Sequence, residues 1–149
     1  MPENIPLSLT LLYPFAPVDE VDSHRETLVS FFASYEPFEL VLDRLEQWDE
    51  GGAVYAAPSP EEPLRGMMRA LWRLFPQYPP YREEGIDPPP HASLTETGGE
   101  DRQATRSRVE QRLAGLLPAR IPIDEVTLME EFERDRWRVR ETSPSRRSA

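Results

Sequence analysis

The side chains best suited to chemistry lie in two short stretches of alternating polar and apolar residues, Ser8-Leu9-Thr10-Leu11 and His91-Ala92-Ser93-Leu94. Side chains of a β-strand point alternately to opposite faces. We therefore expect Ser8 and Thr10 to share one face of a strand, and His91 and Ser93 to share one face of another. An imidazole, with an ordinary pKa of about 6.5, can act as base or acid near neutrality, and hydroxyls donate hydrogen bonds to anionic oxygens.

The chain has the pattern of one unit that occurs twice. Ser8 and His91 are separated by the same number of positions as Thr10 and Ser93, and a helix and a hairpin follow each stretch. Similarity at a fixed offset is typical of a repeated unit. We predict an α+β fold with two lobes, about residues 7–58 and 91–142, in a single domain. Two antiparallel sheets would flank a central groove, with helices on the outside and a ligand between the lobes.

Periodicity and turn signals place the elements that must hold these residues. They predict strands at 7–13, 38–48, 53–57, 91–97, 121–131 and 136–141, and helices at 19–35, 60–75 and 101–117. The helix at 60–75 follows a capping box at residues 59–62. The hairpin between 38–48 and 53–57 turns at Gly51 and Gly52. Residues 76–90 are rich in proline and form an extended linker, and residues 143–149 are expected to be a disordered tail.

Composition excludes several kinds of site. The chain has 149 residues, enough for one domain with a real core, and no cysteine, so it has neither a disulfide framework nor a thiolate metal site. No group of residues has metal-ligand spacing, and no cofactor is expected. All 17 basic residues are arginine. This usage excludes a lysine nucleophile and is a habit of GC-rich bacterial genomes.

Charge and hydropathy restrict the partners. The formal net charge of -10 opposes binding to duplex DNA, which requires many cations to neutralise phosphates, but it leaves a small phosphorylated ligand open. Apolar runs are too short to span a bilayer, and the start Met1-Pro2-Glu3-Asn4 lacks the features of a signal peptide. We expect a cytoplasmic monomer that does not bind membranes.

The two stretches and their surroundings resemble the two-histidine phosphoesterase superfamily, within it the 2′-5′ RNA ligase-like, cyclic phosphodiesterase branch. That family carries one His-x-Thr/Ser motif in each lobe. The resemblance rests on residues 8–15, on Pro90 to Leu94, and on the flanking sequences Pro79-Pro80-Tyr81 and Ile123-Asp124-Glu125-Val126-Thr127-Leu128. It covers nearly the whole chain except the tail.

The resemblance implies that His91 and the residue at position 8 exchange protons, while Thr10 and Ser93 bind the phosphate. Opening a 2′,3′-cyclic phosphate needs a water deprotonated on one side of phosphorus and a leaving oxygen protonated on the other. Here the first motif departs from the family pattern, because Ser8 stands where the family has histidine. Serine does not exchange a proton near neutral pH, and the loss of one acid or base typically costs roughly 10²–10⁴ in rate.

Each candidate has a structural alternative. Tyr13 and Phe15 are able to stack a nucleobase, or they are core residues at the end of a strand. His24 is interpreted as a helix-flank residue rather than a replacement for the missing imidazole. Thr10 and Ser93 are also compatible with ordinary strand positions. An arginine of the helix at 101–117, or Arg120, would reach a ligand phosphate or simply face solvent.

Three functions follow from the resemblance. The first is slow hydrolysis or binding of a 2′,3′-cyclic or 2′-5′-linked nucleotide, with His91 as the remaining acid or base. The second is a protein without catalysis that binds a nucleotide or an RNA terminus through the same groove. The third is a protein-interaction module in which that site is vacant.

Overall fold

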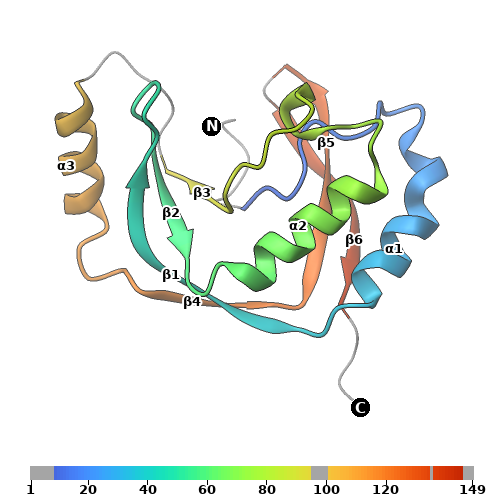
Figure 1. The fold of residues 1–149 in the computed structure, drawn as a ribbon, viewed down its shortest axis with the longest axis horizontal. Helices are drawn as coiled ribbons and strands as arrows, with labels where there is room; N and C mark the ends of the chain where they lie inside the picture. The colour runs from blue at the N-terminus through green and yellow to red at the C-terminus, as the bar shows by residue number, and fades with distance from the viewer. Residues whose placement is uncertain (1–8, 95–100, 135, 146–149) are drawn as a thin grey trace.

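A computed structural model describes residues 9–94, 101–134 and 136–145 of the chain. The protein has an α+β fold with two antiparallel sheets (Figure 1). Its elements, in chain order, are η1 (Val21–His24), α1 (Arg25–Ala33), β1 (Phe38–Gln47), β2 (Val54–Pro58), α2 (Glu62–Leu74), η2 (Pro80–Arg82), β3 (Ala92–Ser93), α3 (Arg102–Arg112), β4 (Ala119–Ile123), β5 (Glu125–Glu133) and β6 (Arg136–Pro144). The predicted fold class, α+β with two antiparallel sheets, is confirmed.

The larger sheet has four strands in the order β3-β2-β1-β4. The predicted hairpin forms β1 and β2, and its turn contains Gly51 and Gly52, whose φ angles are 76° and 71°. These left-handed values suit glycine and explain the Gly-Gly pair. Strands β3 and β4 come from the second half of the chain and pair with β2 and β1. Both halves of the sequence therefore contribute to this one sheet.

Helix α2 covers one face of the larger sheet. Leu64 and Met68 of α2 pack with Leu40, Leu42 and Ala92 of the sheet, all of them buried. The adjacent side of α2 forms a second apolar cluster with α1, in which the buried residues are Phe32, Met67, Leu71 and Phe75. Because apolar residues recur at helical spacing in the sequence 64–75, the sequence predicts this face correctly.

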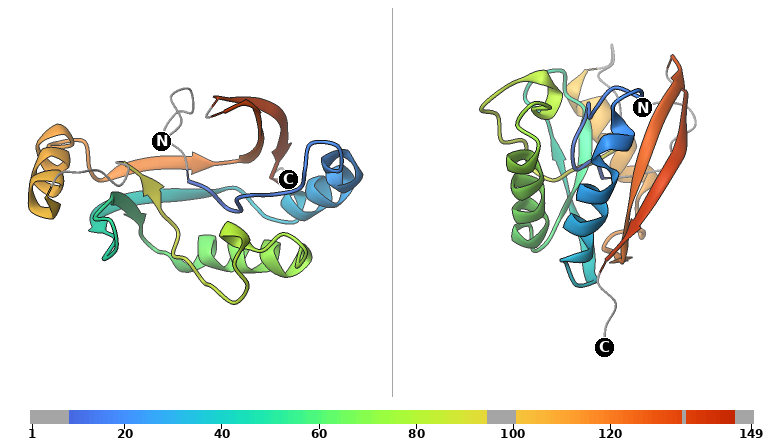
Figure 2. Two further views of the ribbon diagram at one scale, coloured as in Figure 1. Left: turned by 90° about the horizontal axis from the view of Figure 1, so that it is seen from above. Right: turned by 90° about the vertical axis from the view of Figure 1, so that its right-hand side faces the viewer.

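The smaller sheet is the β5–β6 hairpin, which lies beside α1 on the side away from α2 (Figure 2). Ion pairs connect the two elements. Arg140 of β6 contacts Asp22 at 2.9 Å and Glu130 of β5 at 3.0 Å, and Glu141 accepts from Arg25 at 2.7 Å. The Glu130 side chain is only 10% exposed, so its pairing with Arg140 compensates for a nearly buried charge.

Several predicted strands are shorter or divided. Among the described residues of the stretch 7–13, Leu9 forms a single antiparallel bridge with Ala92, and no longer strand is present. The stretch 121–131 is divided at Asp124 between β4 and β5, which belong to different sheets. The predicted strand 91–97 is reduced to β3, and its last three residues lie outside the described part of the chain.

Helix ends and the tail also differ from the predictions. No capping box forms, since α2 begins at Glu62 and the Ser59 N–H donates to the Val41 carbonyl instead. Helix α3 ends at Arg112 rather than near Leu117, and Asp101 caps its start. The tail predicted to be disordered from Ser143 is ordered to Ser145, because β6 extends to Pro144 and the Ser145 N–H donates to the Asp124 carbonyl. Within the described residues, no helix is both long enough and apolar enough to cross a bilayer.

Two glycines provide a test of these backbone assignments. Gly66 lies on the exposed side of α2, where an added Cβ would meet no atom within 4 Å. We expect Gly66→Ala to raise the free energy of unfolding by about 0.5–1 kcal/mol, because glycine is a poor helix former. Gly52→Ala is the control, and its φ of +71° predicts a loss of roughly 1–2 kcal/mol. Urea denaturation measures both, and a destabilising Gly66→Ala would contradict the placement of α2.

Candidate functional site around His91

His91 lies at the start of β3, directly after three consecutive prolines, Pro88 to Pro90. Its neighbour Ala92 packs into the α2 side of the sheet. Because strand residues alternate between faces, His91 belongs to the opposite face. The His91 residue is only 8% exposed. A nearly buried imidazole with defined partners has a restricted orientation.

The hydrogen bonds of His91 assign a role to each ring nitrogen. The Nδ1 atom lies 2.7 Å from the carbonyl oxygen of Pro89. A carbonyl oxygen can only accept, so Nδ1 carries the proton and donates it. In the neutral ring the lone pair is therefore on Nε2, which faces the Tyr81 hydroxyl at 3.4 Å. This is the tautomer in which Nε2 can accept a proton from a nucleophile.

Two aromatic rings enclose the imidazole. The ring centroids of Trp48 and Tyr55 lie 5.1 Å and 5.7 Å from that of His91, both with an edge-to-face geometry. Trp48 and Tyr55 also contact each other, with centroids 4.5 Å apart. Trp48 directly follows β1, and Tyr55 lies in β2, so both belong to the first hairpin. Burial, followed by the nearby Glu46 carboxylate, raises the pKa of the Tyr55 hydroxyl.

Tyr81 approaches from the proline-rich linker with an uncommon backbone. The φ angles of Tyr81 and Arg82 are 54° and 58°, in the left-handed region that residues with a Cβ rarely occupy. The Tyr81 N–H donates to the Tyr13 carbonyl at 2.6 Å, and the two rings lie 6.3 Å apart. Strained backbone of this kind gathers at functional sites. The residue is 44% exposed, but its hydroxyl end is partly buried, and burial raises the pKa of that hydroxyl.

The two segments that contain the predicted motif residues lie side by side in the structure. The antiparallel bridge between Leu9 and Ala92 places Thr10, which is exposed, across from His91 in the register of the two segments. Ser93 pairs with Tyr55 in the β2–β3 register. Ser8 lies outside the described residues. The structure thus brings the chain segments of Thr10, His91 and Ser93 together, and the roles of these residues at a site stay predictions.

The two aromatic candidates differ. Tyr13 is 44% exposed and contacts Tyr81 on one side and Trp137 on the other, with centroids 5.8 Å apart in the second pair. Phe15 instead packs among His24, Phe75 and Tyr78. The ring of Phe15 therefore belongs to the second apolar cluster, which fits the alternative that it is a core residue, and base stacking by Phe15 stays a prediction. His24 lies in the same cluster and is hydrogen-bonded to the Tyr78 hydroxyl at 3.0 Å.

Three of the arginines considered for phosphate binding have other partners, namely Arg102, Arg106 and Arg120. Arg102 and Arg106 of α3 donate to the backbone carbonyls of Trp48 and Leu45 at 2.7 Å and 3.1 Å, which attaches α3 to the end of β1. Arg120 of β4 pairs with Glu39 at 2.7 Å on an exposed surface. Within the described residues, no group of three or more His, Asp or Glu residues has the arrangement of a metal site.

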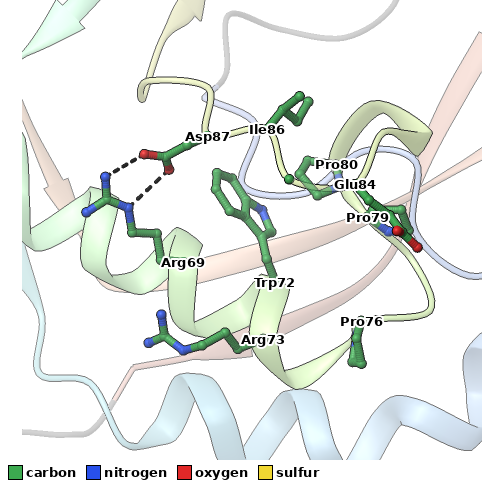
Figure 3. A pocket seen from close by; sticks show the side chains of 10 residues that line it. Arg69, Trp72, Arg73, Pro76, Pro79, Pro80, Glu84, Ile86 and Asp87 are labelled. Carbon is green, nitrogen blue, oxygen red and sulfur yellow. Dashed lines mark hydrogen bonds and ion pairs between the residues drawn. The ribbon is translucent and has the colours of Figure 1, made fainter.

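A shallow hollow of about 480 Å³ lies on the other side of the linker, between α2 and residues 76–87 (Figure 3). Trp72 and the prolines of the linker line it, and an ion pair between Arg69 and Asp87 closes one edge. The hydrogen bond from Arg69 lowers the pKa of the Asp87 carboxyl. Pro79 and Pro80 line this hollow, whereas the next residue, Tyr81, contacts His91. The hollow is therefore separate from the His91 group.

Sequence reasoning did not identify the aromatic surroundings of His91. Trp48 follows β1 and Tyr55 lies in β2, both far from His91 in the sequence, whereas Tyr81 lies in the linker, ten positions before His91. The only available signal was alternation, since Trp48 and Tyr55 stand on either side of the Gly51-Gly52 turn, where ends of paired strands meet. No local pattern predicts that Tyr81 turns back toward the histidine.

The tautomer of His91 is directly measurable. We expect neutral His91 to carry its proton on Nδ1, because the Pro89 carbonyl requires a donor. Long-range ¹H–¹⁵N correlation spectra of the histidine rings distinguish the two tautomers, and a His91→Gln variant assigns the signals against those of His24. A neutral ring protonated on Nε2 would contradict the hydrogen bond to Pro89.

The raised pKa values of Tyr55 and Tyr81 predict a pH dependence of stability. The folded state favours the protonated phenols, so their contribution to stability is fully present below the ordinary pKa of about 10 and is lost as the pH rises through the higher folded values. We expect Tyr81→Phe to show a smaller loss of unfolding free energy than the parent between about pH 9 and pH 11. Equal losses in urea denaturation would show that the Tyr81 hydroxyl titrates as it does in the unfolded chain.

Comparison with known proteins identifies the family of the chain. A search of curated protein sequences finds no match to the chain. The family model of the 2′-5′ RNA ligase superfamily matches residues 2–135, a range that contains both motif stretches and every described helix and strand except β6. The chain therefore belongs to the 2′-5′ RNA ligase superfamily.

Proposed function

We propose that the protein binds 2′,3′-cyclic or 2′-5′-linked nucleotides at the His91 site and hydrolyses them with weakened catalysis. The observation that carries this proposal is the orientation of His91. Its Nδ1 atom is committed to the Pro89 carbonyl, so Nε2 is the atom available for proton exchange. Fixing one ring nitrogen so that the other can react is a general way in which enzymes prepare a histidine.

The rest of the motif supplies groups for the phosphate. Thr10 stands across from His91 in the chain register, and Ser93 follows two residues later in the sequence. Hydroxyl groups in these positions would donate hydrogen bonds to the non-bridging oxygens, where negative charge is held during transfer. Water would then attack phosphorus as its proton passes to His91 Nε2. The bond from phosphorus to one ribose oxygen would break, and that oxygen would take its proton from solvent.

Weak catalysis follows from Ser8. In-line displacement places the attacking and leaving oxygens on opposite sides of phosphorus, so one imidazole can serve only one of them. Serine at position 8 would bind phosphate but would not exchange the second proton near neutral pH. A deficit of roughly 10²–10⁴ in rate relative to a site with two histidines is the expected size of this effect.

The same serine favours a second candidate function, binding without turnover. In this alternative the site recognises a nucleotide or an RNA terminus and releases it unchanged. We propose for both functions that the ligand is a small nucleotide or a single-stranded end, because a net charge of -10 opposes association with long duplexes. We propose that the protein performs either function as a monomer in the cytoplasm.

The decisive experiment compares the parent with Ser8→His and His91→Gln. Each protein is incubated with adenosine 2′,3′-cyclic phosphate in the presence of a chelator, and the product monophosphate is quantified. We expect slow turnover by the parent, loss of turnover in His91→Gln, and an increase of about 10²-fold in Ser8→His, because a second imidazole restores the missing proton transfer.

Binding measurements separate the alternatives. Saturable binding of the cyclic nucleotide with no turnover by the parent would favour the non-catalytic function. If neither the parent nor Ser8→His binds or cleaves any cyclic or 2′-5′-linked nucleotide, both functions are wrong. Circular dichroism of each variant is the control for folding, and Arg120→Gln, on the exposed strand β4, is a matched control that should leave turnover unchanged.

A further inference from the structure

The Tyr81 hydroxyl is placed where it can touch whatever His91 binds. It lies 3.4 Å from His91 Nε2, which is longer than an optimal hydrogen bond between these groups. Hydrogen bonds in active sites are often long without ligand and tighten when the substrate arrives. Two polar groups ten positions apart in the chain therefore converge on the same small volume, and the direct bond between them is weak enough to be exchanged for bonds to a ligand.

The backbone around Tyr81 is arranged to hold this position. Tyr81 and Arg82 both have left-handed φ angles, which are unfavourable for residues with a Cβ. Hydrogen bonds from the N–H groups of Tyr81, Arg82 and Glu83 to the carbonyls of Tyr13, Pro79 and Pro80 stabilise this conformation, and Pro80 is buried. Strain that is maintained by several contacts next to a buried histidine indicates a functional constraint.

The distance decides which role Tyr81 can have. Acid and base in an in-line displacement stand on opposite sides of phosphorus, so two groups only 3.4 Å apart must act on the same side. Tyr81 is therefore not a replacement for the missing imidazole of the first motif. Burial raises the pKa of its hydroxyl, so that near neutral pH the hydroxyl keeps its proton and is a donor.

We propose that Tyr81 is a substrate-binding residue whose hydroxyl donates a hydrogen bond to a phosphate oxygen on the His91 side of the ligand. The inference rests on the proposed function and deepens it. It specifies a phosphate-bearing ligand terminus as the group recognised next to His91, and it assigns this recognition to the linker in addition to the two motifs.

The test uses Tyr81→Phe, which removes the hydroxyl and keeps the ring. Calorimetric titration compares three probes, adenosine 2′,3′-cyclic phosphate, adenosine 3′-monophosphate and adenosine itself. We expect Tyr81→Phe to weaken binding of both phosphate-bearing probes by about tenfold, the usual value of one hydrogen bond to a charged group, and to leave any binding of adenosine unchanged. A purely structural role would affect all three probes alike.

The chain offers a matched control. Tyr78 makes a similar contact, with its hydroxyl 3.0 Å from Nε2 of His24, but inside the apolar cluster of α1 and α2. Tyr78→Phe should leave the affinity for all three probes at the parent value. Thermal unfolding of both variants provides the comparison of stability.

The remaining outcomes separate the two proposals. If the parent and Tyr81→Phe bind the phosphate-bearing probes equally, the role of Tyr81 is wrong and the proposed function stands. A loss that is equal for adenosine and its phosphates would indicate either a structural role of Tyr81 or a contact with the nucleoside, and either result would overturn the phosphate assignment. If the parent binds none of the probes, and Ser8→His also binds none, the proposed function fails and this inference fails with it.

Discussion

The burial of one face of α2 is the constraint on which the rest of the molecule depends. Leu64 and Met68 close the apolar side of the four-stranded sheet, and Met67 and Leu71 on the adjacent side form the cluster with α1. A single helix of 13 residues thus joins two groups of elements that come from both halves of the chain. Because interiors are closely packed, its position also determines where the linker that follows it can run, and hence where Tyr81 lies.

The opposite face of the same sheet carries the candidate site around His91. Because side chains of a strand alternate between faces, neighbouring residues have different roles. Ala92 packs toward α2 in the core, while His91 contacts Trp48 and Tyr55 on the other face. Aromatic rings enclose the imidazole, and one backbone carbonyl accepts a hydrogen bond from it. Holding the ring in this orientation therefore costs little conformational free energy. The family model matches a range of the chain that includes this histidine.

The sequence predicts the parts that depend on local periodicity. The apolar spacing of residues 64–75 gave the buried face of α2, and the glycine pair at 51–52 gave the first hairpin. The sequence-based prediction fails where contacts between distant parts of the chain determine strand pairing and burial. Nothing near Asp124 indicates that neighbouring strands join different sheets, and Ser143 is buried only because β6 finds β5 and α1. The fragment His91-Ala92-Ser93 predicts the histidine of the site, but its aromatic partners depend on tertiary packing that no local pattern encodes.

Proline is placed at both borders of the four-stranded sheet. Pro88 to Pro90 precede β3 at one border, and Pro122 lies within β4 at the other. Proline has no N–H, and in an edge strand its nitrogen faces away from the neighbouring strand, so Pro122 leaves β4 without a donor that an added strand would need. At the other border, the bridge from Leu9 to Ala92 already occupies the outer side of β3. The two borders therefore oppose edge-to-edge pairing between copies of the sheet in different ways, one by a proline and the other by a bridging segment.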